Sequence, residues 1–211
     1  MSKIEYIDVI VKNGDITAEK ADCIVVPQFK GGASYGGVGY AINAAGMGKG
    51  LQTYGKKAYE KPFEFGDSII TSSGKTGVKL AHVVTAGAEA EAQPLAIIKS
   101  VFSTLVSANQ QKIKYIAIPE LGTGIIGHLT QEQSAQTVFN AVYEFAKATP
   151  VSSIKQVSFV IYKDSVEPAL KVLKDKTYTK LPSNMTGGKR FNEIAWLFGM
   201  CNNGIGKLYF V

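Results

Sequence analysis

A glycine-rich segment, residues 121–128, lies between an apolar run at 115–119 and a stretch with helical periodicity at 131–147. A strand that ends in a glycine-rich turn before a helix presents backbone N–H groups and a positive helix end to whatever lies there. Phosphate groups are the usual ligands of such a turn. The sequence therefore predicts a phosphate-binding loop at this position.

Strands and helices must alternate along the chain to position such a loop. Apolar, β-branched runs predict strands at 7–11, 24–26, 68–71, 80–85, 115–118 and 157–162. Helical patterns lie between them at 39–59, with a glycine break, and at 94–109, 131–147 and 165–173. This β-α-β alternation predicts a three-layer α/β sandwich.

Glycine-rich segments follow several of these strands. In α/β folds, ligands bind at the carboxyl ends of the strands, where loops from several strands meet. Four segments are expected there: residues 14–17, 31–39, 86–87 and 121–128. Glycine allows close approach of the backbone or a positive φ. Turn formation alone would explain the glycines of any one segment, but a shared ligand-binding edge explains their presence in all four segments.

The composition is that of an ordinary globular protein, with 45% hydrophobic and 19% charged residues in 211. No apolar stretch reaches the roughly 20 residues of a membrane helix, and the start of the chain does not resemble a secretion signal. We therefore expect a cytoplasmic protein with no membrane span. Cys23 and Cys201 are too few for a disulfide scaffold or a zinc site, and we expect neither a metal nor a cofactor.

The formal net charge is +6, and six basic against two acidic residues after residue 173 account for +4 of it. The body of the protein is therefore nearly neutral. Nucleic-acid binders more often concentrate arginines on one face, whereas Arg190 is the single arginine of this chain. The charge pattern disfavours a nucleic-acid partner.

Residues 176–211 do not continue the alternation. Prolines, glycines and asparagines break them into short pieces between large apolar side chains. Aromatic clusters are usually structural, so we expect a C-terminal extension packed on a domain formed by residues 1–175. The basic residues of the extension leave a second interpretation open, an interaction module that works through this tail.

The order of motifs resembles that of a macro domain, the ADP-ribose-binding module. The similar segments are 14–17 (GDIT), 21–25 (ADCIV), 36–42 (GGVGYAI), 44–46 (AAG), 66–67 (GD), 85–87 (TAG), 118–119 (IP) and 122–127 (GTGIIG). Each is weak alone, but their shared order is a specific signal. The resemblance covers about residues 5 to 173. It implies a three-layer α/β/α sandwich with a mixed central sheet that binds ADP-ribose, free or attached to a protein.

At the adenine end, the resemblance assigns Asp15 to the adenine N6 amine and the backbone N–H of Ile16 to a ring nitrogen. A carboxylate in a loop after a strand can accept such a bond. Taken alone, the same motif could be only a turn and a helix cap. Tyr162, at the end of the last predicted strand, is expected to stack on the adenine ring.

At the diphosphate and the terminal ribose, the resemblance assigns mainly backbone groups, which can bind a diphosphate without an arginine. The expected residues are Gly36, Gly37, Val38, Ala86, Gly122, Thr123, Gly124, Ile125, Ile126, Gly127 and His128. His128 stands where the family usually has an aromatic residue beside the terminal ribose. A role as a helix-capping surface residue remains equally open for it.

The chain departs from the pattern of hydrolytic macro domains. These commonly read Asn-Ala-Ala-Asn after the second strand, where this chain has residues 26–29 (VPQF). Gly39 and Ile126 stand where two branches of the family carry an acidic residue. Without groups that activate water, binding is better supported than catalysis, and no catalytic residue is assigned. Hydrolysis of an ADP-ribosyl or O-acetyl-ADP-ribose substrate is the alternative, with Gln28 or Ser34 positioning water.

Overall fold

The computed structural model describes residues 2–33, 36–86, 94–124 and 128–180. Within these ranges, one sheet contains strands β1 (Ser2–Ile4), β2 (Ile7–Asn13), β3 (Cys23–Phe29), β4 (Ser68–Ser72), β5 (Lys79–Ala86), β6 (Tyr115–Pro119) and β7 (Gln156–Ile161). The longer helices are α1 (Val38–Ile42), α2 (Gly48–Glu60), α3 (Pro94–Gln110), α4 (Gln131–Ala148) and α5 (Glu167–Asp175). Short helical turns are η1 (Ile16–Ala18), η2 (Asn43–Met47) and η3 (Thr177–Thr179).

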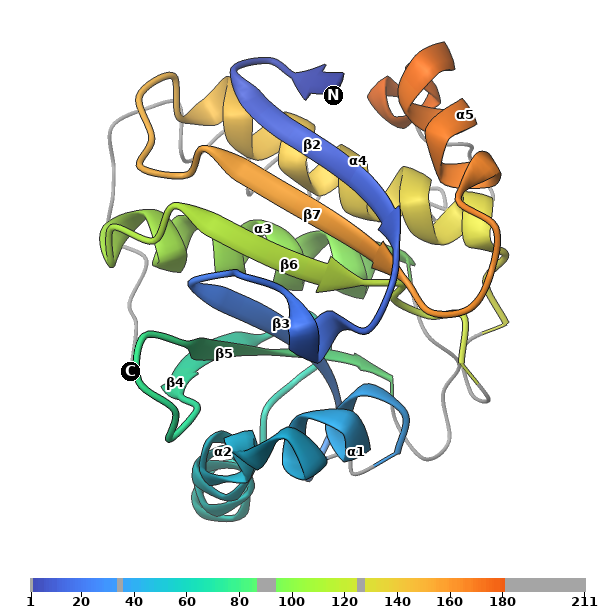
Figure 1. The fold of residues 1–211 in the computed structure, drawn as a ribbon. Helices are drawn as coiled ribbons and strands as arrows, with labels where there is room; N and C mark the ends of the chain where they lie inside the picture. The colour runs from blue at the N-terminus through green and yellow to red at the C-terminus, as the bar shows by residue number, and fades with distance from the viewer. Residues whose placement is uncertain (1, 34–35, 87–93, 125–127, 181–211) are drawn as a thin grey trace.

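The sheet is mixed, with the strand order β1-β2-β7-β6-β3-β5-β4. The five strands from β2 to β5 in this order are parallel, while β1 and β4 are antiparallel at the two edges. Because the five parallel strands run in one direction, their carboxyl ends meet along one edge of the sheet (Figure 1). The predicted α/β fold with a mixed sheet is confirmed.

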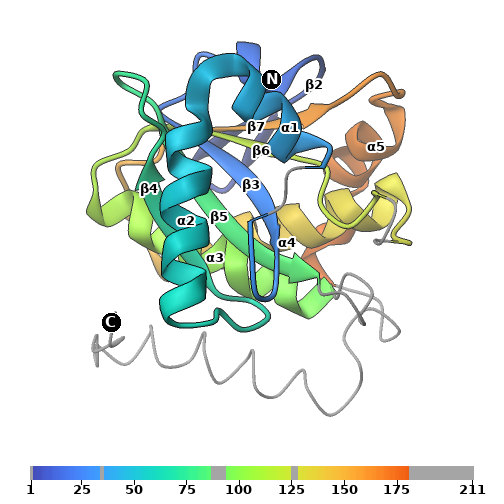
Figure 2. The same ribbon diagram turned by 90° about the horizontal axis from the view of Figure 1, so that it is seen from below.

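Helices cover both faces of the sheet (Figure 2). Val25 of β3 belongs to the larger core cluster, which joins the sheet to α3, α4 and α5. Its neighbours Ile24 and Val26 belong to the cluster beneath α1 and α2. Successive side chains of a strand point to opposite faces, so β3 is buried on both sides, as central parallel strands are.

The expected glycine break in the 39–59 segment lies at Gly46, whose φ of 79° separates α1 from α2. The strand predicted at 24–26 is longer, because it continues through Pro27 to Phe29. A proline has no backbone N–H to donate to a neighbouring strand, so the sequence alone argues against a strand at this position. In the structure, β3 pairs with β6 only through Cys23 and Ile24, so Pro27 lies where one side of the strand has no ladder.

The first residues of the C-terminal extension pack on α4. Tyr178 is buried, with its ring in edge contact with those of Phe139 and Tyr143. Asn140 donates its side-chain N–H to the Tyr178 carbonyl oxygen at 2.8 Å. The rest of the extension, residues 181–211, lies outside the described residues, so the boundary at 175 stays a prediction. Among the helices described, none is long and apolar enough to cross a membrane.

Candidate functional site

The predicted site residues follow five neighbouring strands and lie along one edge of the sheet. In the order of the strands, Asp15 and Ile16 follow β2, Tyr162 follows β7, Gly122, Thr123 and Gly124 follow β6, Gly36, Gly37 and Val38 follow β3, and Ala86 ends β5. This edge is hereafter called the carboxyl edge. Three further candidates, Ile125, Ile126 and Gly127, lie outside the described residues.

Asp15 caps the short turn η1 and keeps one carboxylate oxygen open. Its Oδ1 accepts hydrogen bonds from the Thr17 backbone N–H and the Thr17 hydroxyl, both at 2.8 Å. No hydrogen bond from a described residue reaches Oδ2. Ile16 is buried in one cluster with Ile42 of α1 and Val160 of β7. A capping role and a ligand-binding role of Asp15 are therefore compatible, because the cap uses one carboxylate oxygen and leaves the other exposed to solvent.

The loops after β2 and β7 are tied together. The Gly14 N–H donates to the Ile161 carbonyl at 2.9 Å, and the Asn13 side chain donates to the Asp164 carbonyl at 2.6 Å. Tyr162 is 61% exposed, with the Lys163 ammonium 4.8 Å from its ring centroid. An open carboxylate oxygen and an exposed aromatic ring thus belong to adjacent loops, and these are groups that suit a purine with an exocyclic amine.

The loop after β6 is anchored at both ends. The Leu121 N–H donates to the Ser134 hydroxyl at 2.9 Å, and the Leu129 N–H donates to the Gly122 carbonyl at 3.0 Å. At the start of α4, Thr130 and Gln133 form a reciprocal capping box. This box occupies the N–H groups of Thr130 and Gln133, so these two donors are satisfied within the protein.

Three glycines of the carboxyl edge face open space. A Cβ atom added at Gly36, Gly37 or Gly124 would meet no described atom within 4 Å. Gly37 has a φ of 50° and precedes α1, which has no side-chain cap. His128 is exposed with a φ of 51°. Ala86 is engaged in the sheet, since its carbonyl accepts the Lys30 N–H at 2.8 Å. A ligand can therefore approach the backbone closely at the three glycines.

Glu120 is an acidic residue of the carboxyl edge that the sequence analysis missed. It is half-buried between the end of β6 and the glycine-rich loop. Burial raises the pKa of its carboxyl; the nearby Gln131 amide opposes this, and the negative charge of Asp164 adds to it. The sequence feature that could have identified Glu120 is its position, directly after a predicted strand and before the glycine-rich loop. Within the described ranges, no group of three or more His, Cys, Asp or Glu side chains could hold a metal ion.

Gln28 does not lie on the open edge, contrary to its expected role in positioning water. It is 2% exposed, and its Nε2 lies 2.9 Å from His82 Nδ1. The other ring nitrogen, His82 Nε2, lies 2.8 Å from the Thr71 hydroxyl, and the Tyr54 ring stacks on the imidazole with 4.8 Å between centroids. This buried polar network supports α2 on the sheet. Ser34 lies outside the described residues.

We expect His82 to make the stability of the protein depend on pH. Burial lowers the pKa of its imidazole to about 3, whereas the unfolded chain protonates near its ordinary value of about 6.5. The stability gained from the neutral imidazole is complete above the unfolded pKa and is lost as the pH falls towards 3. We expect a loss of about 2 kcal/mol in unfolding free energy between pH 7 and pH 5, measured by urea denaturation.

The matched control for this prediction is His82→Gln, which keeps hydrogen-bonding groups in the network but cannot titrate. Its unfolding free energy should change much less over the same pH range than that of the unmodified protein. Equal pH dependence of the two proteins would mean that His82 does not carry the effect.

The fold and the carboxyl edge define an α/β/α domain whose glycine-rich loops gather where ligands bind in such proteins. The family model of the macro domain matches residues 28–138. Histone macroH2A1.1 of Capsaspora owczarzaki is 31% identical over 156 residues, which are 72% of this chain and 42% of the histone. An uncharacterized protein of Aquifex aeolicus is 32% identical over 79% of this chain and 98% of its own length. The chain belongs to the macro domain family.

Solved structures share this fold. The Oceanobacillus iheyensis macrodomain, solved as a glycine-to-valine variant with ADP-ribose, superimposes with a TM-score of 0.70 and 21% identity over 83% of this chain and 97% of that one. The same macrodomain with ADP gives a TM-score of 0.67 at 19% identity over the same shares. A Trypanosoma brucei macrodomain in complex with ADP gives 0.64 at 17% identity, covering 78% of this chain and 68% of that one.

Proposed function

We propose that this protein binds ADP-ribose, free or attached to a protein, along the carboxyl edge. The observation that carries the proposal is that the loop with the open Oδ2 of Asp15 is hydrogen-bonded to the loop with the exposed ring of Tyr162, on the same edge as the open glycine backbone. The macrodomains of similar fold that hold ADP-ribose or ADP support it.

The proposed ligand lies across the strand ends. The adenine contacts Asp15 and the backbone N–H of Ile16, and Tyr162 covers the ring. The diphosphate lies between the loop of residues 36–38 and the loop of residues 122–127, where backbone N–H groups bind its oxygens. The terminal ribose lies towards Ala86 and His128. The chain supplies every group in this arrangement without a metal.

Isothermal titration calorimetry with ADP-ribose, ADP and AMP tests the proposal. Binding of ADP-ribose with clearly weaker binding of AMP is the expected pattern, because AMP lacks the second phosphate. No heat with any of the three nucleotides at two temperatures would reject the proposal.

Asp15→Asn separates the two roles of this residue. An asparagine oxygen can still cap η1 at Thr17, while its NH₂ group replaces the acceptor that the adenine amine requires. We expect a loss of about tenfold or more in ADP-ribose affinity, because hydrogen bonds to charged groups contribute about 1.5–3 kcal/mol. Calorimetry measures the affinity, and thermal unfolding should show little change in stability.

The control for the adenine assignment is Thr17→Val, which removes the hydroxyl bond to Asp15 but leaves the carboxylate in place. This variant should retain ADP-ribose affinity within about twofold, since the capping bond is not part of the ligand contact. Unchanged affinity in Asp15→Asn, with folding intact, would remove the adenine assignment.

A second candidate function, hydrolysis of an ADP-ribosyl or O-acetyl-ADP-ribose bond, is favoured by Glu120. Its half-buried carboxyl has a raised pKa beside the proposed diphosphate loop, and a general base works best with a pKa close to the working pH. An assay for release of ADP-ribose from an ADP-ribosylated protein, comparing the unmodified chain with Glu120→Gln, tests this candidate. Equal release by the two proteins would exclude Glu120 as the base.

A further inference from the structure

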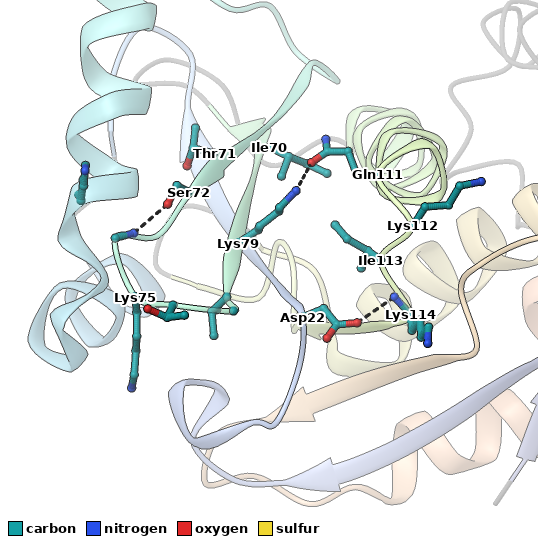
Figure 3. Close-up of a pocket in the computed structure, with 15 residues that line it drawn as sticks. Asp22, Ile70, Thr71, Ser72, Lys75, Lys79, Gln111, Lys112, Ile113 and Lys114 are labelled. Carbon is teal, nitrogen blue, oxygen red and sulfur yellow. Dashed lines mark hydrogen bonds between the residues drawn. The ribbon is translucent and has the colours of Figure 1, made fainter.

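An open hollow of about 800 Å³ (Figure 3) is lined by residues at the edge of the sheet opposite the carboxyl edge. Asp22 precedes β3, Lys79 begins β5 and Lys114 precedes β6, so the hollow is formed at the amino ends of these strands. The turn between β4 and β5, residues 73–78, closes one side of it. The hollow is separated from the proposed ADP-ribose site by the length of the strands.

The lining of this hollow is strongly positive. Five lysines contribute to it from three separate parts of the chain: Lys49, Lys75, Lys79, Lys112 and Lys114. In the view of Figure 3, Lys75 and Lys112 lie on opposite sides of the hollow. The Lys79 ammonium donates to the Gln111 side-chain oxygen at 2.6 Å. Among the described residues, none of the five forms a salt bridge with an acidic side chain.

The single acidic residue of the described lining does not balance this charge. Asp22 Oδ2 accepts the backbone N–H groups of Lys114 and Tyr115, at 2.9 and 3.0 Å. Its carboxylate therefore fixes the segment before β6 (Figure 3). A cleft lined by an excess of one sign of charge attracts ligands of the opposite sign, so the lining of this hollow favours an anion.

The fold holds the lysine-bearing segments in place. Gly74 has a φ of 87°, and a Cβ atom added there would lie 2.8 Å from the Lys49 Cβ, so glycine allows the turn to approach α2. Within the turn, the Ser73 hydroxyl donates to the Val78 carbonyl at 2.7 Å and accepts the Lys75 N–H at 3.0 Å. The positive charges therefore lie on an ordered frame.

We propose that this hollow binds a small molecule with several linked phosphate groups, an oligophosphate. Lysine ammonium groups are compact point charges that bind phosphate oxygens, and the hollow lies within the volume of about 300–1,000 Å³ usual for small-molecule sites. Single-stranded nucleic acid would require aromatic side chains for base stacking. The described lining has no aromatic side chain, so it is suited to binding phosphate groups and not to stacking on bases.

Tripolyphosphate, titrated calorimetrically into the full chain in the presence of saturating ADP-ribose, tests the proposal. Lys75→Gln, Lys112→Gln and Lys114→Gln are combined in one variant, because all three side chains are exposed. We expect about a tenfold loss in tripolyphosphate affinity, because three positive charges that face the phosphate oxygens are removed. Added salt should weaken the binding, and ADP-ribose affinity should stay unchanged.

A matched control removes the same charge elsewhere, with Lys57→Gln, Lys61→Gln and Lys171→Gln combined. It should retain tripolyphosphate affinity within about twofold. Absence of binding by the unmodified chain, or equal losses in both triple variants, would overturn the proposal. A single-stranded oligonucleotide that binds the hollow more tightly than tripolyphosphate would also overturn it. If ADP-ribose itself does not bind, the comparison of the two variants still decides this site.

Discussion

Gly122→Val is expected to destabilise the protein by about 3 kcal/mol. Gly122 has a φ of 82°, where a β-branched residue is strained, and such strain costs about 1–3 kcal/mol. An added Cβ would also lie 2.7 Å from Leu129 Cδ1 and 3.2 Å from Ile97 Cδ1. Forcing extra atoms into a packed site adds a further cost of about 1–3 kcal/mol. Both effects act at the first residue of the anchored loop.

Thermal unfolding measures this effect, and the melting temperature should fall by about 10 °C for a protein of this size. The same substitution at Gly124 is the control, because it adds the same atoms where no described neighbour lies within 4 Å. A melting temperature unchanged in Gly122→Val would show that the loop adapts and that glycine is not required for folding at this position.

Gly124→Val is expected to weaken ADP-ribose binding by about 100-fold while the melting temperature stays within about 1–2 °C of the original. Gly124 is exposed and does not have a positive φ, and surface substitutions of this kind usually change stability by less than about 0.5 kcal/mol. In the proposed complex, however, the valine side chain occupies the space of the diphosphate oxygens. Losing two charge-assisted hydrogen bonds corresponds to about 3 kcal/mol.

Calorimetry with ADP-ribose and with adenosine separates a diphosphate effect from a general one. Adenosine lacks the diphosphate, so its binding should be unaffected by Gly124→Val. Full ADP-ribose affinity in this variant would place the diphosphate away from the loop of residues 122–127, and the proposed orientation of the ligand would then be wrong.

Local sequence patterns predicted six of the seven strands and their alternation with helices, but not the edge strand β1 or the order of the strands in the sheet. Strand and helix periodicity is a property of neighbouring residues, and the glycines at 36–37 and 122–124 mark places where the backbone must stay open. The boundaries of individual strands were less predictable. Pro27 lies inside β3 only because β6 leaves that part of the strand unpaired, and no local pattern contains this information.

Roles that depend on burial could not be read from residue type. Gln28 looked like a polar group near the ligand, but strand alternation turns it to the face beneath α2, where it meets His82. Glu120 was overlooked because its raised pKa results from burial and from Asp164, which lies 44 positions further along the chain. Such environments form only when distant segments pack together.

The sequence by itself determined the alternation of elements, the macro domain motifs and the total charge, because each depends on residue identity and short spacing. Only the tertiary structure decided where the charges gather. The body of the chain is nearly neutral by count, yet the sheet order β6-β3-β5-β4 and the packing of α2 bring five lysines to one hollow. The physical reason is that strand pairing joins segments remote in sequence, and electrostatic interactions depend on distance in space.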